Sequence, residues 1–73
     1  MPTPTELLHN QIEQHGFPWL NEMQLLDAGC TLAQIDQAVE SGEIVRRRGI
    51  RHDVYRLCDA VIIEQYGDDV LTY

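Results

Sequence analysis

Five arginines, all within residues 46–56, are the side chains of this chain best suited to binding chemistry. They are Arg46, Arg47, Arg48, Arg51 and Arg56, and the chain contains no lysine. A guanidinium group is planar, always charged and rich in donors, which suits phosphate oxygens and the edges of bases. Residues 44–57 hold a single acid, Asp53, so their local charge is +4. This segment favours binding to nucleic acid. The alternative is that the arginines mark a charged strand edge that discourages aggregation.

The rest of the chain is acidic. The formal net charge is −7, and the 59 residues outside 44–57 hold eleven acids and no Lys or Arg. The total argues against a protein that coats nucleic acid indiscriminately. The segregation of the charges predicts a polarised surface, with one cationic region on an anionic body.

The arginines are expected on a β-hairpin that spans residues 43–57. Residues 49–53 form its tip, where Arg51 and His52 are placed to reach a minor groove or a phosphate. Side chains alternate between the two sides of a strand. On the first strand of the hairpin, one side is expected to carry Ile44, Arg46 and Arg48, and the other Val45 and Arg47.

Two short helices are expected before the hairpin, at residues 22–28 and 32–41. Asn21 and Thr31 are suitable N-caps for them, and a glycine follows each helix as a stop. The intervening turn is of the kind that joins the two helices of a DNA-binding motif at a steep angle. The order helix, turn, helix and hairpin is that of a winged helix-turn-helix.

The helix at 32–41 has an apolar side and a polar side at about 100° per residue. The apolar side is predicted to face the core and holds Leu32, Ile35 and Val39; the polar side holds Gln34, Gln37 and Ser41. Gln can bind adenine in a bidentate manner, and Ser can contact several bases. The alternative is that these polar side chains are simply solvated. We expect the arginine hairpin to lie beside the glutamine side, although the flanking Asp36 and Glu40 would repel phosphates.

The remaining segments are expected to support this unit. Residues 3–15 are predicted to form a first helix, and the link at 17–20 is a candidate for a short strand that pairs with the hairpin. Residues 60–66 are predicted to form a last helix, whose apolar residues exceed what one face can bury. The surplus suggests a homodimer contact. The tail at 68–73 has three possible roles: it frays, it joins the dimer, or it binds a partner.

No pattern for catalysis, a metal or a cofactor is found. The sequence has no Gly-rich phosphate loop and no nucleophile or zinc motif. His9 and His15 lie about 120° apart on the expected first helix, too divergent to share a metal. Cys30 and Cys58 stand in no metal-ligand spacing, and as two isolated thiols in a chain without a targeting signal they are expected to be reduced. We therefore expect a protein that is not an enzyme.

The sequence also bears on location. No apolar run approaches the roughly 20 residues needed to cross a bilayer. The N-terminal residues lack the basic flank and apolar stretch of a signal peptide. A cytoplasmic protein without membrane contact is expected.

A family resemblance is carried by three stretches, at residues 19–35, 41–49 and 54–57. Their sequences are WLNEMQLLDAGCTLAQI, SGEIVRRRG and VYRL. Together they resemble the winged-helix domain at the N-terminus of AbiEi-type abortive-infection antitoxins and related small regulators. From its first residue to its last, the likeness spans about 40 of the 73 residues. It implies promoter binding and transcriptional autoregulation, with the helix at 32–41 and the hairpin touching DNA.

Two features depart from that family. The chain stops where the antitoxins continue into a second domain, so antitoxin activity is not carried over. The hairpin is also longer, with residues 50–53 inserted between Gly49 and Val54, and the net charge is unusually acidic.

The sequence thus predicts one domain over residues 1–73, mainly α with a small β-hairpin (α+β), of the winged helix-turn-helix type. The leading function is a small transcriptional regulator that binds double-stranded DNA. The proposed contact residues are Gln34, Gln37, Ser41, Arg46, Arg47, Arg48, Arg51, His52 and Arg56. The alternative is a winged-helix module that binds a partner protein through its acidic surface. RNA binding is a weaker third reading, because no exposed aromatic platform for stacking is expected.

Overall fold

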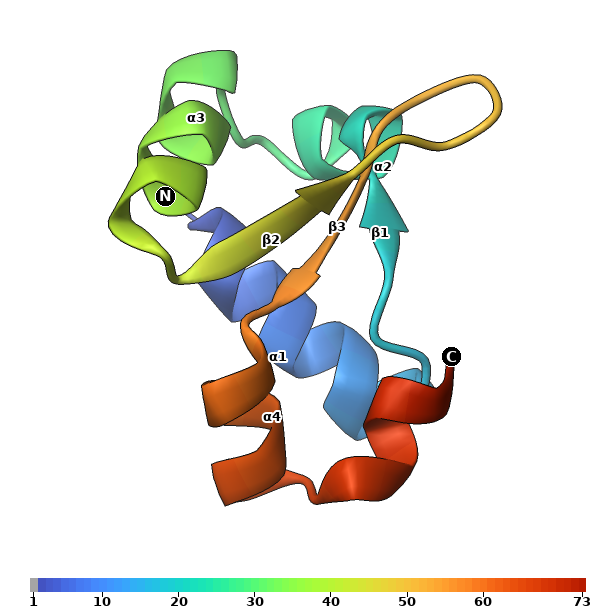
Figure 1. The fold of residues 1–73 in the computed structure, drawn as a ribbon. Helices are drawn as coiled ribbons and strands as arrows, with labels where there is room; N and C mark the ends of the chain where they lie inside the picture. The colour runs from blue at the N-terminus through green and yellow to red at the C-terminus, as the bar shows by residue number, and fades with distance from the viewer. Residues whose placement is uncertain (1) are drawn as a thin grey trace.

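The computed structural model describes residues 2–73, and these form an α+β fold in which helices pack against one side of a three-stranded antiparallel sheet (Figure 1). Four α-helices and one 3-10 helix lie within the described residues. The elements in chain order are α1 Pro4–His15, β1 Leu20–Asn21, α2 Glu22–Asp27, α3 Leu32–Ser41, β2 Ile44–Arg47, β3 Val54–Leu57, α4 Asp59–Gln65 and the 3-10 helix η1 Asp68–Thr72.

The ends of α2 and α3 are set by local side-chain chemistry. Asn21 accepts a hydrogen bond from the backbone N–H of Gln24, and the Gln24 side chain accepts one from the N–H of Asn21. Thr31 and Gln34 form the same reciprocal pair at the start of α3. Each pair satisfies two N–H groups at the helix start that have no partner inside the helix. Gly42 ends α3 with φ of 85°, a conformation that favours glycine.

Strand β3 lies at the centre of the sheet, between β1 and β2. The register pairs Leu20 of β1 with Tyr55, and Arg46 of β2 with the same Tyr55. Residues directly opposite each other in an antiparallel sheet point to the same side. One side of the sheet therefore carries Leu20, Ile44, Arg46, Tyr55 and Leu57, and the other carries Asn21, Val45, Arg47, Val54 and Arg56. We call the second side the outer face.

The core fills the space between the inner side of the sheet and the helices. Its buried residues are Leu8, Ile12, Leu25, Cys30, Ile35, Ala38, Ile44, Tyr55, Leu57 and Ile62. On α3 the expected core face is partly wrong, because Leu32 is 53% exposed while Ala38 is buried. Leu32 and Ala38 lie about 60° to either side of the buried Ile35 around the helix axis, and the side that packs against α1 and β2 includes Ala38 and not Leu32. Met23 on α2 is half-exposed as well.

The C-terminal elements pack under α1 (Figure 1). Helix α4 begins at Asp59, one residue before the predicted start, and the side chain of its N-cap residue Cys58 makes no capping bond within residues 2–73. Val70 and Leu71 of η1 lie against the core, so this segment is not a frayed tail. Among the described residues, every helix is too short or too polar to cross a membrane.

Candidate nucleic-acid interface

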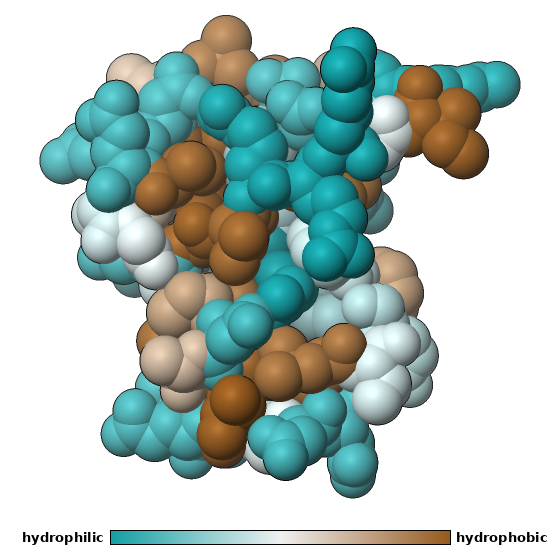
Figure 2. All heavy atoms as spheres, in the orientation of Figure 1, coloured by the Kyte–Doolittle hydropathy of each residue, from teal (hydrophilic) through white to brown (hydrophobic). Residues whose placement is uncertain are grey.

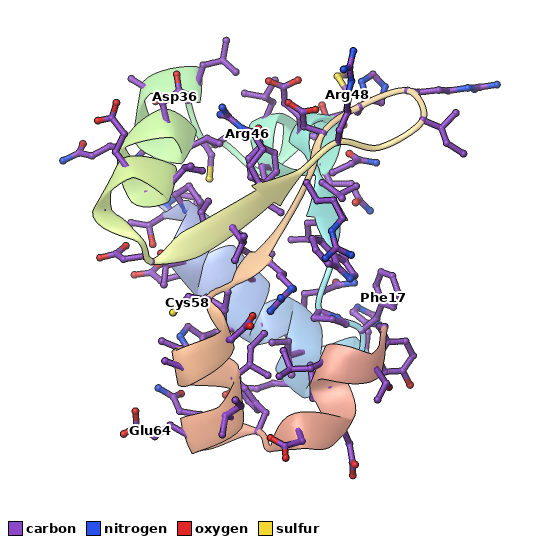
Figure 3. The ribbon with its side chains drawn as sticks, in the orientation of Figure 1. Phe17, Asp36, Arg46, Arg48, Cys58 and Glu64 are labelled. Atoms are coloured by element: carbon purple, nitrogen blue, oxygen red, sulfur yellow. The ribbon has the colours of Figure 1, made fainter. Side chains whose placement is uncertain are left out.

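The loop between β2 and β3 extends away from the body and carries cations (Figures 1 and 3). Arg48, Arg51 and His52 are exposed there, and none of them forms an ion pair within residues 2–73. Ile50 at the loop is fully exposed. Figure 2 shows hydrophilic atoms at this end of the molecule, with apolar atoms exposed beside them. The loop therefore offers an accessible group of positive side chains.

Arg46, by contrast, is engaged by neighbouring residues. Its guanidinium lies 2.5 Å from the carboxylate of Asp36 on α3 and 3.9 Å from that of Asp53. Its Nε donates to the hydroxyl of Tyr55 at 3.1 Å. The hydrogen bonds to Asp36 and to Tyr55 raise the pKa of Arg46 above its usual value. Figure 3 shows Asp36 and Arg46 facing each other between α3 and β2. This arginine is held in place as a link between the helix and the hairpin.

Two further arginines lie on the outer face against Trp19. The guanidinium groups of Arg47 and Arg56 lie 5.0 and 5.3 Å from the centre of the indole ring. Both distances suit a cation–π interaction. Arg56 also forms an ion pair with Asp59 at 2.5 Å, and its side chain is only 13% exposed. Arg47 is exposed and has no ion-pair partner within residues 2–73.

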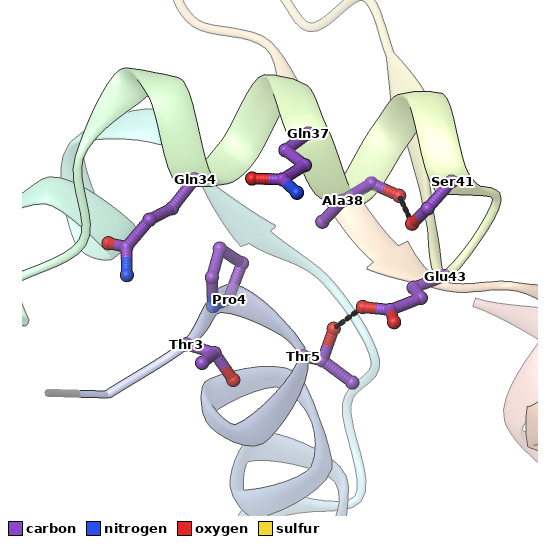
Figure 4. A pocket seen from close by; sticks show the side chains of 8 residues that line it. All are labelled: Thr3, Pro4, Thr5, Gln34, Gln37, Ala38, Ser41 and Glu43. Carbon is purple, nitrogen blue, oxygen red and sulfur yellow. Dashed lines mark hydrogen bonds between the residues drawn. The ribbon is translucent and has the colours of Figure 1, made fainter.

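The polar side of α3 faces the N-terminus of α1 (Figure 4). The Gln34 side chain accepts the capping bond from Thr31, and the Ser41 hydroxyl donates to the carbonyl of Ala38. The side chain of Gln37 is exposed and makes no hydrogen bond within residues 2–73. These residues line a hollow of about 270 Å³ together with Thr3, Pro4, Thr5, Ala38 and Glu43. Within residues 2–73, Gln37 is thus the one of these three residues whose side chain makes no hydrogen bond.

The hairpin and the glutamine side therefore do not form the single footprint that we expected. Arg46 approaches α3 at Asp36, and Gln34 lies about 160° from Asp36 around the helix axis. Ser41 lies about 140° from Asp36 around the same axis. The hairpin meets the acidic side of α3, where Glu40 is also exposed. Arg46, the arginine that contacts α3, is thus partly neutralised by acids. The arginines without an ion pair within residues 2–73 are Arg48 and Arg51 on the loop and Arg47 on the outer face.

An aromatic cluster on the outer face was missed by the sequence analysis. Phe17 and Tyr73 pack edge to face with ring centres 5.6 Å apart. The indole N–H of Trp19 donates to the backbone oxygen of Tyr73 at 3.0 Å. Phe17 is 43% exposed and Tyr73 61% exposed, so the statement that no exposed aromatic platform exists is wrong. The sequence separation of 54 between Trp19 and Tyr73 hides the cluster.

A second polar cluster joins α1 to α4. His9 Nδ1 lies 2.7 Å from the hydroxyl of Tyr66, and that hydroxyl donates to Glu13 at 3.3 Å. Burial, and then the nearby Glu13 carboxylate, raise the pKa of Tyr66. His15 does not take part in this cluster. Within residues 2–73, no group of three or more His, Cys, Asp or Glu side chains is arranged to hold a metal ion.

Compared with models of known protein families, with curated proteins and with solved structures, the chain matches none of them.

Proposed function

We propose that this chain is a winged-helix protein that binds double-stranded DNA as a small transcriptional regulator, with the β2–β3 hairpin as its main contact. The order α1, β1, α2, α3, β2, β3 agrees with that architecture, as does the pairing of β1 with the hairpin. The resemblance of residues 19–57 to the winged-helix domain of AbiEi-type antitoxins points the same way.

The observation that carries this proposal is the set of exposed, unpaired arginines on the hairpin. Arg47, Arg48 and Arg51 have no carboxylate partner within residues 2–73, whereas Arg46 and Arg56 do. An unpaired surface arginine can bind a phosphate without first breaking an internal ion pair. Contacts of this kind supply affinity and register, but no direct sequence reading.

Sequence reading by α3 is limited in this proposal. The side-chain oxygen of Gln34 accepts the capping bond at the start of α3, which leaves its amide nitrogen but removes the bidentate contact to adenine, and the Ser41 hydroxyl donates to Ala38. Within residues 2–73, Gln37 keeps both its amide oxygen and its amide nitrogen without a partner. The exposed Asp36 and Glu40 would oppose a close approach of phosphates. We therefore propose binding in which the hairpin contributes most of the affinity and Gln37 at most one base contact.

The test is the binding of a fluorescent DNA duplex at several salt concentrations. Three phosphate contacts predict that log affinity falls with log salt with a slope of about −2.7. Replacing Arg48 and Arg51 together by Ala should weaken binding to every sequence alike, and the same double replacement by Lys should retain most of it. Absence of a complex at low salt would contradict the proposal.

A second candidate function is binding to a basic partner protein through α3. The observation that favours it is a stripe on α3 formed by Leu32, Asp36 and Glu40, spaced four residues apart, all exposed and next to the hairpin. A stable protein partner that is lost on Glu40→Lys, in a protein that shifts no duplex, would support this candidate over DNA binding.

We also propose that the chain dimerises through its C-terminal region. Ile63 on α4 is half-exposed and is the available apolar side chain of that helix, while Ile62 is buried. Ile63→Glu should convert a dimer into a monomer in sedimentation experiments. An unchanged sedimentation coefficient would rule out this surface.

A further inference from the structure

From the outer face of the sheet we infer a second binding site, one that accepts an unpaired nucleotide of single-stranded DNA or RNA. The site is a hollow of about 380 Å³ lined by Phe17, Trp19, Asn21, Gln24, Arg47, Val54 and Tyr73. This volume lies within the range of small-molecule sites. The inference does not depend on duplex binding by the hairpin loop.

The aromatic side chains supply the stacking surface. Phe17 and Tyr73 meet edge to face, which leaves ring surface of both exposed at the rim of the hollow. Arg47 lies over Trp19, and a guanidinium plane can itself stack on a base. Aromatic and arginine planes together are the usual means by which proteins hold unpaired bases.

The polar groups in the hollow are mainly hydrogen-bond donors. The side-chain oxygens of Asn21 and Gln24 are both used by the reciprocal cap at the start of α2, since each accepts a backbone N–H. Their amide nitrogens have no partner within residues 2–73 and remain available as donors. None of the described residues that line the hollow carries a carboxylate side chain. A ligand that is planar and rich in acceptors, with a negative charge nearby, complements this lining.

The phosphate of such a nucleotide has a place beside the hollow. Arg47 lines it directly, and Asn21 and Val54 also line the neighbouring depression that holds Arg51 and His52 of the loop. The two depressions therefore adjoin at Asn21 and Val54. A single strand with one base in the aromatic hollow would continue along the cationic hairpin. Base stacking gives the local specificity for an unpaired strand, and the arginines give the attraction to its backbone.

Trp19 makes the test direct, because it is the only tryptophan of the chain and lies in the hollow. The full chain is titrated with a short thymidine oligonucleotide, the corresponding uridine oligonucleotide and a proline-rich peptide, with indole fluorescence as the readout. We expect saturable quenching by the oligonucleotides and none by the peptide. The comparison of the two oligonucleotides shows whether DNA or RNA is preferred.

Phe17→Ala and Tyr73→Ala should each weaken oligonucleotide binding about 5- to 150-fold, the range expected for loss of one stacking partner. Phe17→Tyr should restore most of it. Met23→Ala is the matched control, since it removes a similarly exposed apolar side chain that does not line the hollow. Thermal unfolding of each variant verifies that the fold is intact.

Several results would overturn the inference. They are absence of quenching by either oligonucleotide, unchanged affinity of the Phe17 and Tyr73 variants, and quenching by the peptide alone. The outcome is separable from that of the duplex proposal. Phe17→Ala should leave duplex affinity unchanged, whereas the Arg48 and Arg51 double variant should bind the duplex more weakly. If the protein binds the duplex and not the oligonucleotides, only the site in the hollow is ruled out. If it binds the oligonucleotides and not the duplex, only the duplex contact of the hairpin is ruled out.

Discussion

Asp36 of α3 and Arg46 of β2 form an ion pair at 2.5 Å that ties the acidic side of the helix to the hairpin. Tyr55 supports the pair from the neighbouring strand, because its hydroxyl accepts from Arg46. The contact fixes which side of α3 the arginines approach, and it uses one of the five cations internally. The nucleic-acid surface proposed above is therefore the loop and the outer face, not α3.

Asp36→Asn tests the consequence of this pair for binding. The substitution frees Arg46 and removes a negative charge next to the hairpin, so duplex affinity should rise. The cost in folding free energy should be below about 1 kcal/mol, because both side chains are substantially exposed. Binding is measured by fluorescence anisotropy and stability by urea denaturation. Glu64→Gln on α4 is the control, since it makes the same charge change far from the hairpin (Figure 3). An equal gain in both variants would show that only net charge matters.

Tyr55 is predicted to be the most sensitive residue of the sheet. It is 1% exposed and pairs with residues of both β1 and β2. Tyr55→Ala should lower the free energy of unfolding by about 3–5 kcal/mol, as for other large buried aromatics. Tyr55→Phe keeps the packing and loses only the bond to Arg46, at a cost of about 1 kcal/mol. Chemical denaturation distinguishes the two; equal effects of the two substitutions would contradict the packing described here.

Stability should fall at alkaline pH. Burial raises the pKa of both Tyr55 and Tyr66 above the usual value of 10.0. Above about pH 10 the unfolded chain loses these protons before the folded chain does. The folded state then holds more protons, so the free energy of unfolding decreases as pH rises from about 10 toward the folded-state pKa values. The Tyr66→Phe variant should show a shallower decrease. A flat profile above pH 10 in the parent protein would contradict this expectation.

The two thiols should differ in reactivity. Cys30 is buried, and its pKa is raised first by burial and then by the charge of Glu6, whereas Cys58 is half-buried. The thiolate is the reactive form, so a thiol reagent at neutral pH should label Cys58 quickly and Cys30 slowly. The Cys58→Ser variant should retain one slow thiol that becomes fast in denaturant. A fast remaining thiol in the folded variant would show that the Cys30 site opens readily.

Local signals in the sequence predicted the order of the elements well. Asn21, Thr31 and Gly42 act through their own backbone neighbourhood, and each stands at the helix end expected for it. The spacing Thr31-x-x-Gln34 is itself the signature of a capping box. That spacing alone is sufficient to predict that the side-chain oxygen of Gln34 caps the start of α3.

Features that depend on tertiary packing could not be read in the same way. The periodicity of α3 places Leu32 and Ala38 almost symmetrically about Ile35, so it does not say which of them faces the core. The packing partners of the helix decide this. The aromatic cluster likewise forms only because η1 returns Tyr73 to the segment before β1. The side of α3 that meets the hairpin depends on the pair between Asp36 and Arg46, ten residues apart.

The measurement that tests the central claim most directly is the salt dependence of duplex affinity for the parent chain and for the Arg48→Ala, Arg51→Ala double variant. Three phosphate contacts predict a slope of about −2.7 for the parent, and loss of two of them predicts about −0.9 for the variant. Equal slopes for the two proteins, or no duplex binding by the parent at low salt, would contradict the assignment of the hairpin as the DNA contact.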